Sequence, residues 1–177
     1  ACAACGDSGY VGAEPCDCLK KRYAARLTRE LSTILPIGDQ NFEAFRLDYY
    51  SDVPDSRLGM SARENMEYNL SVCRAYADTF SPQAKNLLLY GSTGLGKTFL
   101  SSCIAGVVSR KGYSVAYDTA IRIFGSYESV KFTAPDAAEA ARRVRKYEQS
   151  DLLIVDDLGT EMATSFTVSA FYGLLAG

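Results

Sequence analysis

The chain has 177 residues, of which 47% are hydrophobic and 23% are charged, and its formal net charge is −2. This composition is typical of one globular core, and the near-neutral charge excludes a basic, nucleic-acid-binding surface over the whole protein. No apolar run is long enough to span a bilayer and no signal peptide opens the sequence, so we expect a cytoplasmic protein with no membrane partner.

Four cysteines near the start of the chain form two close pairs, Cys2-x-x-Cys5 and Cys16-x-Cys18. Since histidine is absent, a metal site must use sulfur or carboxylate ligands. Tetrahedral zinc needs four thiolates at about 2.3 Å from the metal, and a segment with no core of its own needs the metal in order to fold. We therefore predict structural zinc at these four residues. The alternatives are a disulfide framework, which a reducing compartment disfavours, and free thiols.

Residues 19–36 have apolar positions at helical spacing, interleaved with basic residues. Pro36 and Gly38 are predicted to end this helix. Together with the zinc segment it would form a partner-contacting end of the molecule; a charged helix that merely faces water is the alternative. The basic residues are Lys20, Lys21, Arg22, Arg26 and Arg29.

An aromatic, turn-rich linker is predicted to follow over residues 37–60. Phe42, Phe45 and Tyr49 could wall an adenine pocket. The sequence favours the other interpretation, in which these aromatic rings hold the linker against the core.

A regular core is predicted from residue 61 onward. Ser61-Ala62-Arg63-Glu64 has the pattern of a capping box and should open a helix that ends near Phe80. Cys73 and Cys103 lie beside apolar residues on predicted helices, so we expect both thiols to be buried. The alternation of strands and helices favours a parallel sheet covered by helices on both faces. The expected strands are 86–90, 113–119 and the run before Asp156; the expected later helices are 97–110, 120–127 and 136–149.

The central stretch Gly91-Ser92-Thr93-Gly94-Leu95-Gly96-Lys97-Thr98 fits the phosphate-loop pattern G-x-x-x-x-G-K-[ST]. Its glycines allow backbone conformations in which successive N–H groups point at phosphate oxygens, and the dipole of the following helix favours an anion there. Lys97 would reach the β- and γ-phosphates, and the Thr98 hydroxyl would bind Mg²⁺. We predict an ATP or ADP site made of these eight residues and Phe99.

A second motif, "LLIVDD", is an apolar strand that ends in two acids. Asp156 is predicted to bind Mg²⁺ together with Thr98, and Asp157 to orient or activate the attacking water, so the predicted catalytic residues are Lys97, Asp156 and Asp157. Glutamate is more usual than aspartate at the second position, which indicates slow hydrolysis. A solvated turn at the strand end is the alternative.

The segments "LLLYGSTGLGKTFLSSCIA", "KGYSVAYDTA", "DLLIVDDLGTE" and "TSF" resemble the bacterial replicative-helicase loaders of the DnaC/DnaI type, within the AAA+ initiator clade. The upstream segments "RLGMSARENM" and "NFEAFRLDYYSD" are also similar to that family. The opening "CAACGDSGYVGAEPCDCLKKRYAARL" is also similar to that family. The resemblance implies an ATPase that binds the hexameric replicative helicase and helps to place it on single-stranded DNA. Transposition helper ATPases of the IstB type share the ATPase core, and the cysteine-bearing opening favours the loader.

The resemblance also implies features that the chain lacks, namely a polar sensor, an arginine finger and a helical lid. Position 1 is Ala, and the final "FYGLLAG" looks like an interrupted helix, so we expect a fragment with an incomplete C-terminal core. The predicted division is a zinc-binding, helicase-contacting segment at 1–36, a linker at 37–60 and an AAA+ core at 61–177. The core could also self-associate.

Contacts with single-stranded DNA need basic residues and aromatic faces. Simple core packing and solvated charges explain the same residues equally well. The candidates are Arg122, Phe124, Tyr127, Lys131, Phe132, Arg142, Arg143, Arg145 and Lys146, with Ser165 and Phe166 where the resembled family places strand-facing elements.

The predicted function is therefore an ATP-dependent helicase loader with slow, partner-stimulated hydrolysis. Its alternatives are an IstB-like helper of DNA transposition, a small-molecule kinase and an ATP-binding adaptor with little turnover.

Overall fold

The computed structural model describes residues 2–57, 59–160 and 164–176. Leu58, Glu161 and Gly177, which belong to stretches quoted above, lie outside these ranges. The chain folds as two compact units, one made of Ala1–Ser81 and Leu89–Gly112 and the other of Pro82–Leu88 and Tyr113–Gly177. The division into 1–36, 37–60 and 61–177 stays a prediction.

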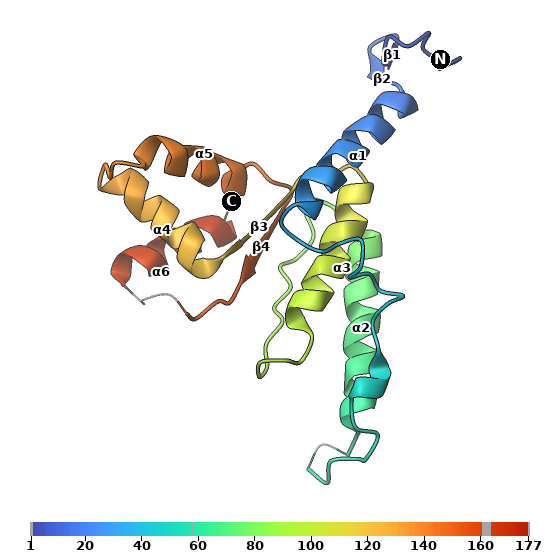
Figure 1. The fold of residues 1–177 in the computed structure, drawn as a ribbon, viewed down its shortest axis with the longest axis vertical. Helices are drawn as coiled ribbons and strands as arrows, with labels where there is room; N and C mark the ends of the chain where they lie inside the picture. Colours follow the sequence, from blue (N-terminus) through green and yellow to red (C-terminus); the bar gives the residue numbers. More distant parts are fainter. Residues whose placement is uncertain (1, 58, 161–163, 177) are drawn as a thin grey trace. The chain divides into compact units, whose positions relative to one another are not determined.

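The first unit is mainly helical. It begins with a two-stranded antiparallel hairpin in which Tyr10 pairs with Pro15 and Val11 with Glu14. Helix α3 packs against both α1 and α2, and buried apolar residues from all three form the core of this unit. The elements are β1 (Tyr10–Val11), β2 (Glu14–Pro15), α1 (Asp17–Ser32), the 3₁₀ helix η1 (Leu47–Tyr49), α2 (Ala62–Thr79) and α3 (Lys97–Arg110) (Figure 1).

The predicted capping box at the start of α2 is confirmed. The Ser61 hydroxyl accepts a hydrogen bond from the Glu64 N–H at 3.1 Å, and the Glu64 carboxylate accepts one from the Ser61 N–H at 2.7 Å. These bonds satisfy two backbone donors that the helix itself leaves unpaired. Helix α1 was predicted less well, since it starts at Asp17 and ends at Ser32, before Pro36.

The two cysteines predicted to be buried are buried: Cys73 is 1% exposed and Cys103 is 2% exposed. Burial raises the pKa of the Cys73 thiol to about 11 and that of Cys103 to about 12, from an ordinary value of 9.0. Both thiols are therefore protonated in the folded protein at neutral pH and are poor nucleophiles.

This burial predicts a loss of stability in mild alkali. Between pH 9 and pH 11 the unfolded chain releases the two thiol protons while the folded chain retains them, so the free energy of unfolding falls as pH rises. We expect a decrease of about 1–2 kcal/mol from pH 9 to pH 10 that the Cys73→Ala/Cys103→Ala double variant lacks. Urea unfolding of both proteins at the two pH values measures it. An identical pH dependence in the two proteins would contradict the assignment.

The second unit is an α/β layer. Strands β3 (Val115–Thr119) and β4 (Leu152–Asp156) are parallel, with Val115 opposite Leu152 and Thr119 opposite Asp156. Its core cluster lies between this sheet and the helices, and joins Ala116, Ile123, Phe124 and Tyr147 to half-buried residues of β4 and α6. The helices are α4 (Ala120–Lys131), α5 (Ala137–Glu148) and α6 (Ser165–Ala176) (Figure 1).

One expectation about the sheet differs from the structure. Residues 86–90 were predicted as its first strand, but they have no regular structure, and Leu88 and Tyr90 are 71% and 89% exposed. An apolar run becomes a strand only where a neighbouring strand supplies backbone partners, and among the described residues β3 pairs only with β4. Helices were also predicted on both faces of the sheet. Helices α4, α5 and α6 contribute to the core cluster beside the sheet, and coverage of the second face stays a prediction.

The remaining elements are close to prediction. Helix α3 has the predicted bounds, and α5 falls within the predicted 136–149. Helix α4 was predicted over 120–127 and continues to Lys131. None of the helices in the described residues has the length and apolar character that crossing a membrane requires.

Candidate functional site

The phosphate-loop stretch forms an exposed turn that leads directly into α3. Gly91, Gly94 and Gly96 have φ values of +143°, +82° and +82°, a region that residues with a side chain rarely adopt. Gly96 is the N-cap of α3 and supplies no side-chain cap, so the start of a 14-residue helix faces the loop without a capping side chain. Backbone of this shape at a helix N-terminus is suited to an anion.

Lys97 lies where the nucleotide hypothesis needs it, in the first turn of α3. Its ammonium group donates hydrogen bonds to the backbone carbonyls of Gly91 and Ser92, each at 2.9 Å. The side chain therefore folds back over the loop and holds its first residues. Thr98 and Phe99, the other predicted ligands on α3, follow in the same turn.

Aromatic residues of the linker pack against this loop. The rings of Phe45 and Tyr50 are stacked with centroids 6.0 Å apart, and Phe45 meets Phe99 edge-on at 5.3 Å. Phe42 is buried, whereas Tyr49 is 76% exposed. Phe42 and Phe45 thus hold the linker to the core, as the sequence favoured, and Tyr49 does not. Tyr50 was missed by sequence reasoning, although it is the neighbour of a residue that was considered.

The two acids of the second motif lie at the carboxyl end of β4. The Asp156 carboxylate accepts hydrogen bonds on both oxygens, from the Tyr117 hydroxyl at 2.7 Å and from the Asp157 N–H at 2.9 Å. Asp157 has a φ of +53°, an unusual conformation for a residue other than glycine. Burial and the bond to Asp156 raise the pKa of Tyr117 above its ordinary value, so this tyrosine stays a hydrogen-bond donor.

Asp118 is a third acid at this end of the sheet, and the sequence analysis did not single it out. It accepts a hydrogen bond from the Tyr147 hydroxyl at 2.9 Å and forms an ion pair with Arg122 at 3.3 Å. The sequence could have indicated Asp118, because this acid lies near the end of the predicted strand 113–119. Arg122, a candidate DNA contact, thus has a partner within the protein.

The loop residues belong to the first unit, and Asp156 and Asp157 belong to the second. A shared Mg²⁺ site of Thr98 and Asp156, and the catalytic roles of Lys97, Asp156 and Asp157, therefore stay predictions.

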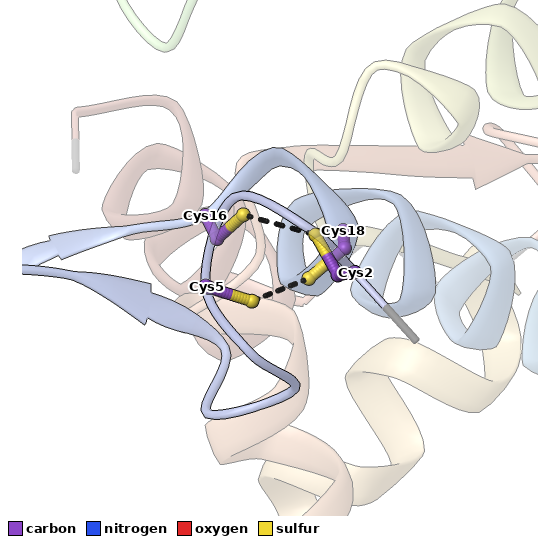
Figure 2. Close-up of side chains that lie close together, drawn as sticks. All are labelled: Cys2, Cys5, Cys16 and Cys18. Carbon is purple, nitrogen blue, oxygen red and sulfur yellow. Dashed lines mark hydrogen bonds between the residues drawn. The ribbon is translucent and has the colours of Figure 1, made fainter.

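Cys2, Cys5, Cys16 and Cys18 lie close together, as predicted. Pairing of β1 with β2 brings the two cysteine pairs together, and the four sulfur atoms lie within 4.8 Å of one another (Figure 2). Cys2 Sγ is 3.8 Å from Cys16 Sγ, and Cys5 Sγ is 3.4 Å from Cys18 Sγ. Four thiolates around tetrahedral zinc lie roughly 3.8 Å apart, so this donor set fits the metal.

The cluster divides its protons unequally. A hydrogen bond with Cys18 lowers the pKa of Cys5 to about 6, and the same contact raises the pKa of Cys18 to about 12. The contact therefore favours the thiolate form at one of the two sulfurs and the thiol form at the other. Because zinc takes four thiolates, metal binding would release the remaining protons.

Some of the candidate DNA-contacting residues are already buried or bonded within the protein, and others are exposed to solvent. Phe124 is 2% exposed, and the Tyr127 hydroxyl donates to Glu148. Arg143 bonds Ser126 and Glu139 within the pair of helices α4 and α5. These three residues serve packing and helix pairing.

Phe132 and Phe166, by contrast, come together from α4's end and α6's start. Their ring centroids are 6.1 Å apart, and the Lys131 ammonium lies 4.3 Å from the centre of the Phe166 ring. Phe132 is 69% exposed. The structure thus places a cation beside two aromatic faces on one surface of the second unit, which the sequence could propose only as separate residues.

Comparison with known proteins adds two similarities. The profile of a family described as "IstB-like ATP binding protein" matches residues 68–175. The chain is also similar to the chromosomal replication initiator protein DnaA of Wolinella succinogenes, with 32% identity over 102 residues. That match covers 57% of this chain and 21% of the relative. No solved structure matches the chain significantly.

Proposed function

This chain belongs to the IstB-like ATP binding protein family, and on that premise we propose that it is an ATP-dependent loader, which binds the replicative DNA helicase and delivers it onto single-stranded DNA. The family supports ATP binding by an AAA+ core of the initiator type. The similarity to a protein named as a replication initiator supports a role in DNA replication.

The observation that carries the loader proposal is the four-cysteine cluster at the start of the basic helix α1. Zinc held there would fix the hairpin to the helix and give the chain a rigid end for a partner. Lys20 and Arg26 are paired with acids of α1 itself, at 3.8 Å and 2.9 Å. A groove of about 490 Å³ lies between α1 and the end of α3, lined by Lys21, Ala24, Ala25, Thr28, Arg29, Ser32 and Arg110.

The phosphates of the nucleotide would be held in the first unit, by Lys97 and the N–H groups of the loop. Thr98 and Asp156 would hold Mg²⁺, which would supply charge neutralisation for the transferred phosphoryl group. Asp157 would orient the attacking water, and its short side chain is consistent with slow turnover that a partner stimulates.

Single-strand binding would use the surface cluster of Lys131, Phe132 and Phe166. Stacking of a base on an aromatic ring contributes about 1–3 kcal/mol and tolerates any base, while lysine attracts the phosphate backbone. This combination is what a loader needs, because it must hold a strand of arbitrary sequence.

A second candidate is a helper ATPase of DNA transposition, which the family match itself favours. Such a helper would bind duplex DNA and a transposase. The aspartate at position 157 also keeps an ATP-binding adaptor with little turnover as an alternative.

The test is to mix the full chain with the replicative helicase of its host and fluorescent DNA, with and without ATP. We expect co-purification with the helicase, preference for single strands over duplex, and faster ATP turnover with both partners. The Phe132→Ala/Phe166→Ala variant should lose affinity for single strands by at least about tenfold. Tyr172→Ala, an exposed aromatic on the same helix α6, is the matched control.

If the chain prefers duplex DNA and does not bind the helicase, the result would favour the function of a helper ATPase in DNA transposition. Binding of helicase and nucleotide with no turnover under any condition would favour the adaptor.

A further inference from the structure

The linker contacts the phosphate loop through one hydrogen bond. The Tyr50 hydroxyl donates to the backbone carbonyl of Leu95 at 3.2 Å, across 45 residues of sequence. Leu95 is the residue before Gly96, and Gly96 opens helix α3. The bond thus joins the linker to the peptide unit of the loop that leads into the N-cap of α3.

That peptide unit determines where one of the loop's N–H groups points. A peptide bond is planar and trans, so the Leu95 carbonyl and the Gly96 N–H point in opposite directions. When Tyr50 holds the carbonyl on its own side, the Gly96 N–H is turned to the other side. The orientation of a potential phosphate donor is therefore coupled to the position of the Tyr50 ring.

Packing fixes the ring as well. A methyl group at Gly96 would lie 2.9 Å from the Tyr50 hydroxyl and 3.2 Å from the Phe45 ring, so the two rings close the space beside Gly96. Phe45 in turn contacts Phe99 in the first turn of α3. Burial raises the pKa of Tyr50, as expected for a partly desolvated phenol.

The backbone of Tyr50 is anchored to α2. The Tyr50 N–H donates to the Leu47 carbonyl at 3.1 Å, and the Arg63 guanidinium donates to the Tyr50 carbonyl at 3.2 Å. The Arg63 N–H also donates to the Ser51 carbonyl at 3.0 Å. Tyr50 is therefore held from both sides, by the start of α2 and by Phe45, before it reaches the loop.

We propose that Tyr50, supported by Phe45, is a positioning residue that orients the Leu95–Gly96 peptide of the phosphate loop for binding a polyphosphate. The proposal rests on the proposed nucleotide site and adds a residue outside the phosphate-loop motif to it. Tyr50 acts through the loop backbone and makes no contact with the base. Removing the Tyr50 hydroxyl should therefore lower the affinity for every polyphosphate ligand, with or without an adenine base.

The experiment compares the full chain with its Tyr50→Phe and Tyr49→Phe variants. Tyr49→Phe is the matched control, because the Tyr49 ring is exposed and lies against the Arg46 guanidinium. Calorimetric titration with ATP and with inorganic tripolyphosphate gives two affinities for each protein. We expect Tyr50→Phe to weaken both ligands by about fivefold, with an unchanged thermal midpoint and with Tyr49→Phe like the wild type.

A loss confined to ATP would overturn the proposal, since it would place Tyr50 against the base. Unchanged affinity for both ligands would also overturn it.

A second measurement needs no ligand. In ¹H–¹⁵N spectra of the free chain, Tyr50→Phe should shift the Gly96 amide resonance and speed its hydrogen exchange, and Tyr49→Phe should not. An unshifted Gly96 amide would overturn the proposal even if no ligand bound. Failure of the wild type to bind either ligand, with a shifted Gly96 amide, would instead contradict the nucleotide site and leave the peptide orientation supported.

Discussion

Replacing Cys16 and Cys18 by serine is expected to abolish zinc binding and to unfold the hairpin at the start of the chain. The cluster consists of four sulfurs within 4.8 Å of one another, two of them contributed by these residues. Structural zinc in small motifs contributes an apparent binding free energy of about 10–16 kcal/mol at neutral pH, and two serines cannot replace two thiolates as ligands. Elemental analysis should find one zinc per wild-type chain and none in the variant.

The expected loss is local. Helices α2 and α3 have their own buried contacts, so nucleotide binding should persist in the variant while helicase binding is lost. Cys73→Ala is the matched control, because it removes a buried thiol outside the cluster and should retain the zinc. Wild-type protein that contains no zinc after purification and reconstitution would refute the metal site.

Replacing Lys97 by alanine is expected to weaken ATP binding by about a hundredfold. The variant loses a charged donor in the first turn of α3, next to an N-terminus that has no capping side chain. Hydrogen bonds from an ammonium group to phosphate contribute about 1.5–3 kcal/mol each, and a loss of about 3 kcal/mol is a hundredfold change in Kd. Calorimetry with ATP and Mg²⁺ measures it.

Two further variants make the lysine test specific. Lys85→Ala removes an exposed lysine outside the loop and should bind ATP normally. Lys97→Arg keeps the charge, but its planar guanidinium does not fit the space of an ammonium, so it should restore only part of the affinity. ATP affinity that is unchanged in Lys97→Ala would exclude the loop as the nucleotide site.

Local signals in the sequence predicted most of the helices. The Ser61–Glu64 capping box and the Gly96–Lys97 junction define where α2 and α3 begin, because caps and glycine conformations depend on neighbouring residues. The run 86–90 was wrong as a strand because strand formation depends on a distant partner. The hairpin of β1 and β2 has two residues per strand, too few for any periodic pattern.

In the candidate sites, too, features set by neighbouring residues were predictable and contacts between distant residues were not. Cysteine spacing predicted the four-sulfur cluster, and the glycine pattern predicted the positive φ angles of the loop. The contacts that orient these groups were not predictable. Tyr50 reaches Leu95 across 45 residues and Tyr117 reaches Asp156 across 39, and neither pair has a short-range signature.

The bonds of Lys97 to Gly91 and Ser92 imply that the loop contains its own competitor. A phosphate ligand that contacts this ammonium group would compete with the two carbonyls for its three N–H donors, so the net gain of binding is smaller than the new contacts alone suggest. A single orthophosphate offers little beyond that contact. A polyphosphate would also engage the loop's N–H groups, and we therefore expect it to bind more tightly than small anions.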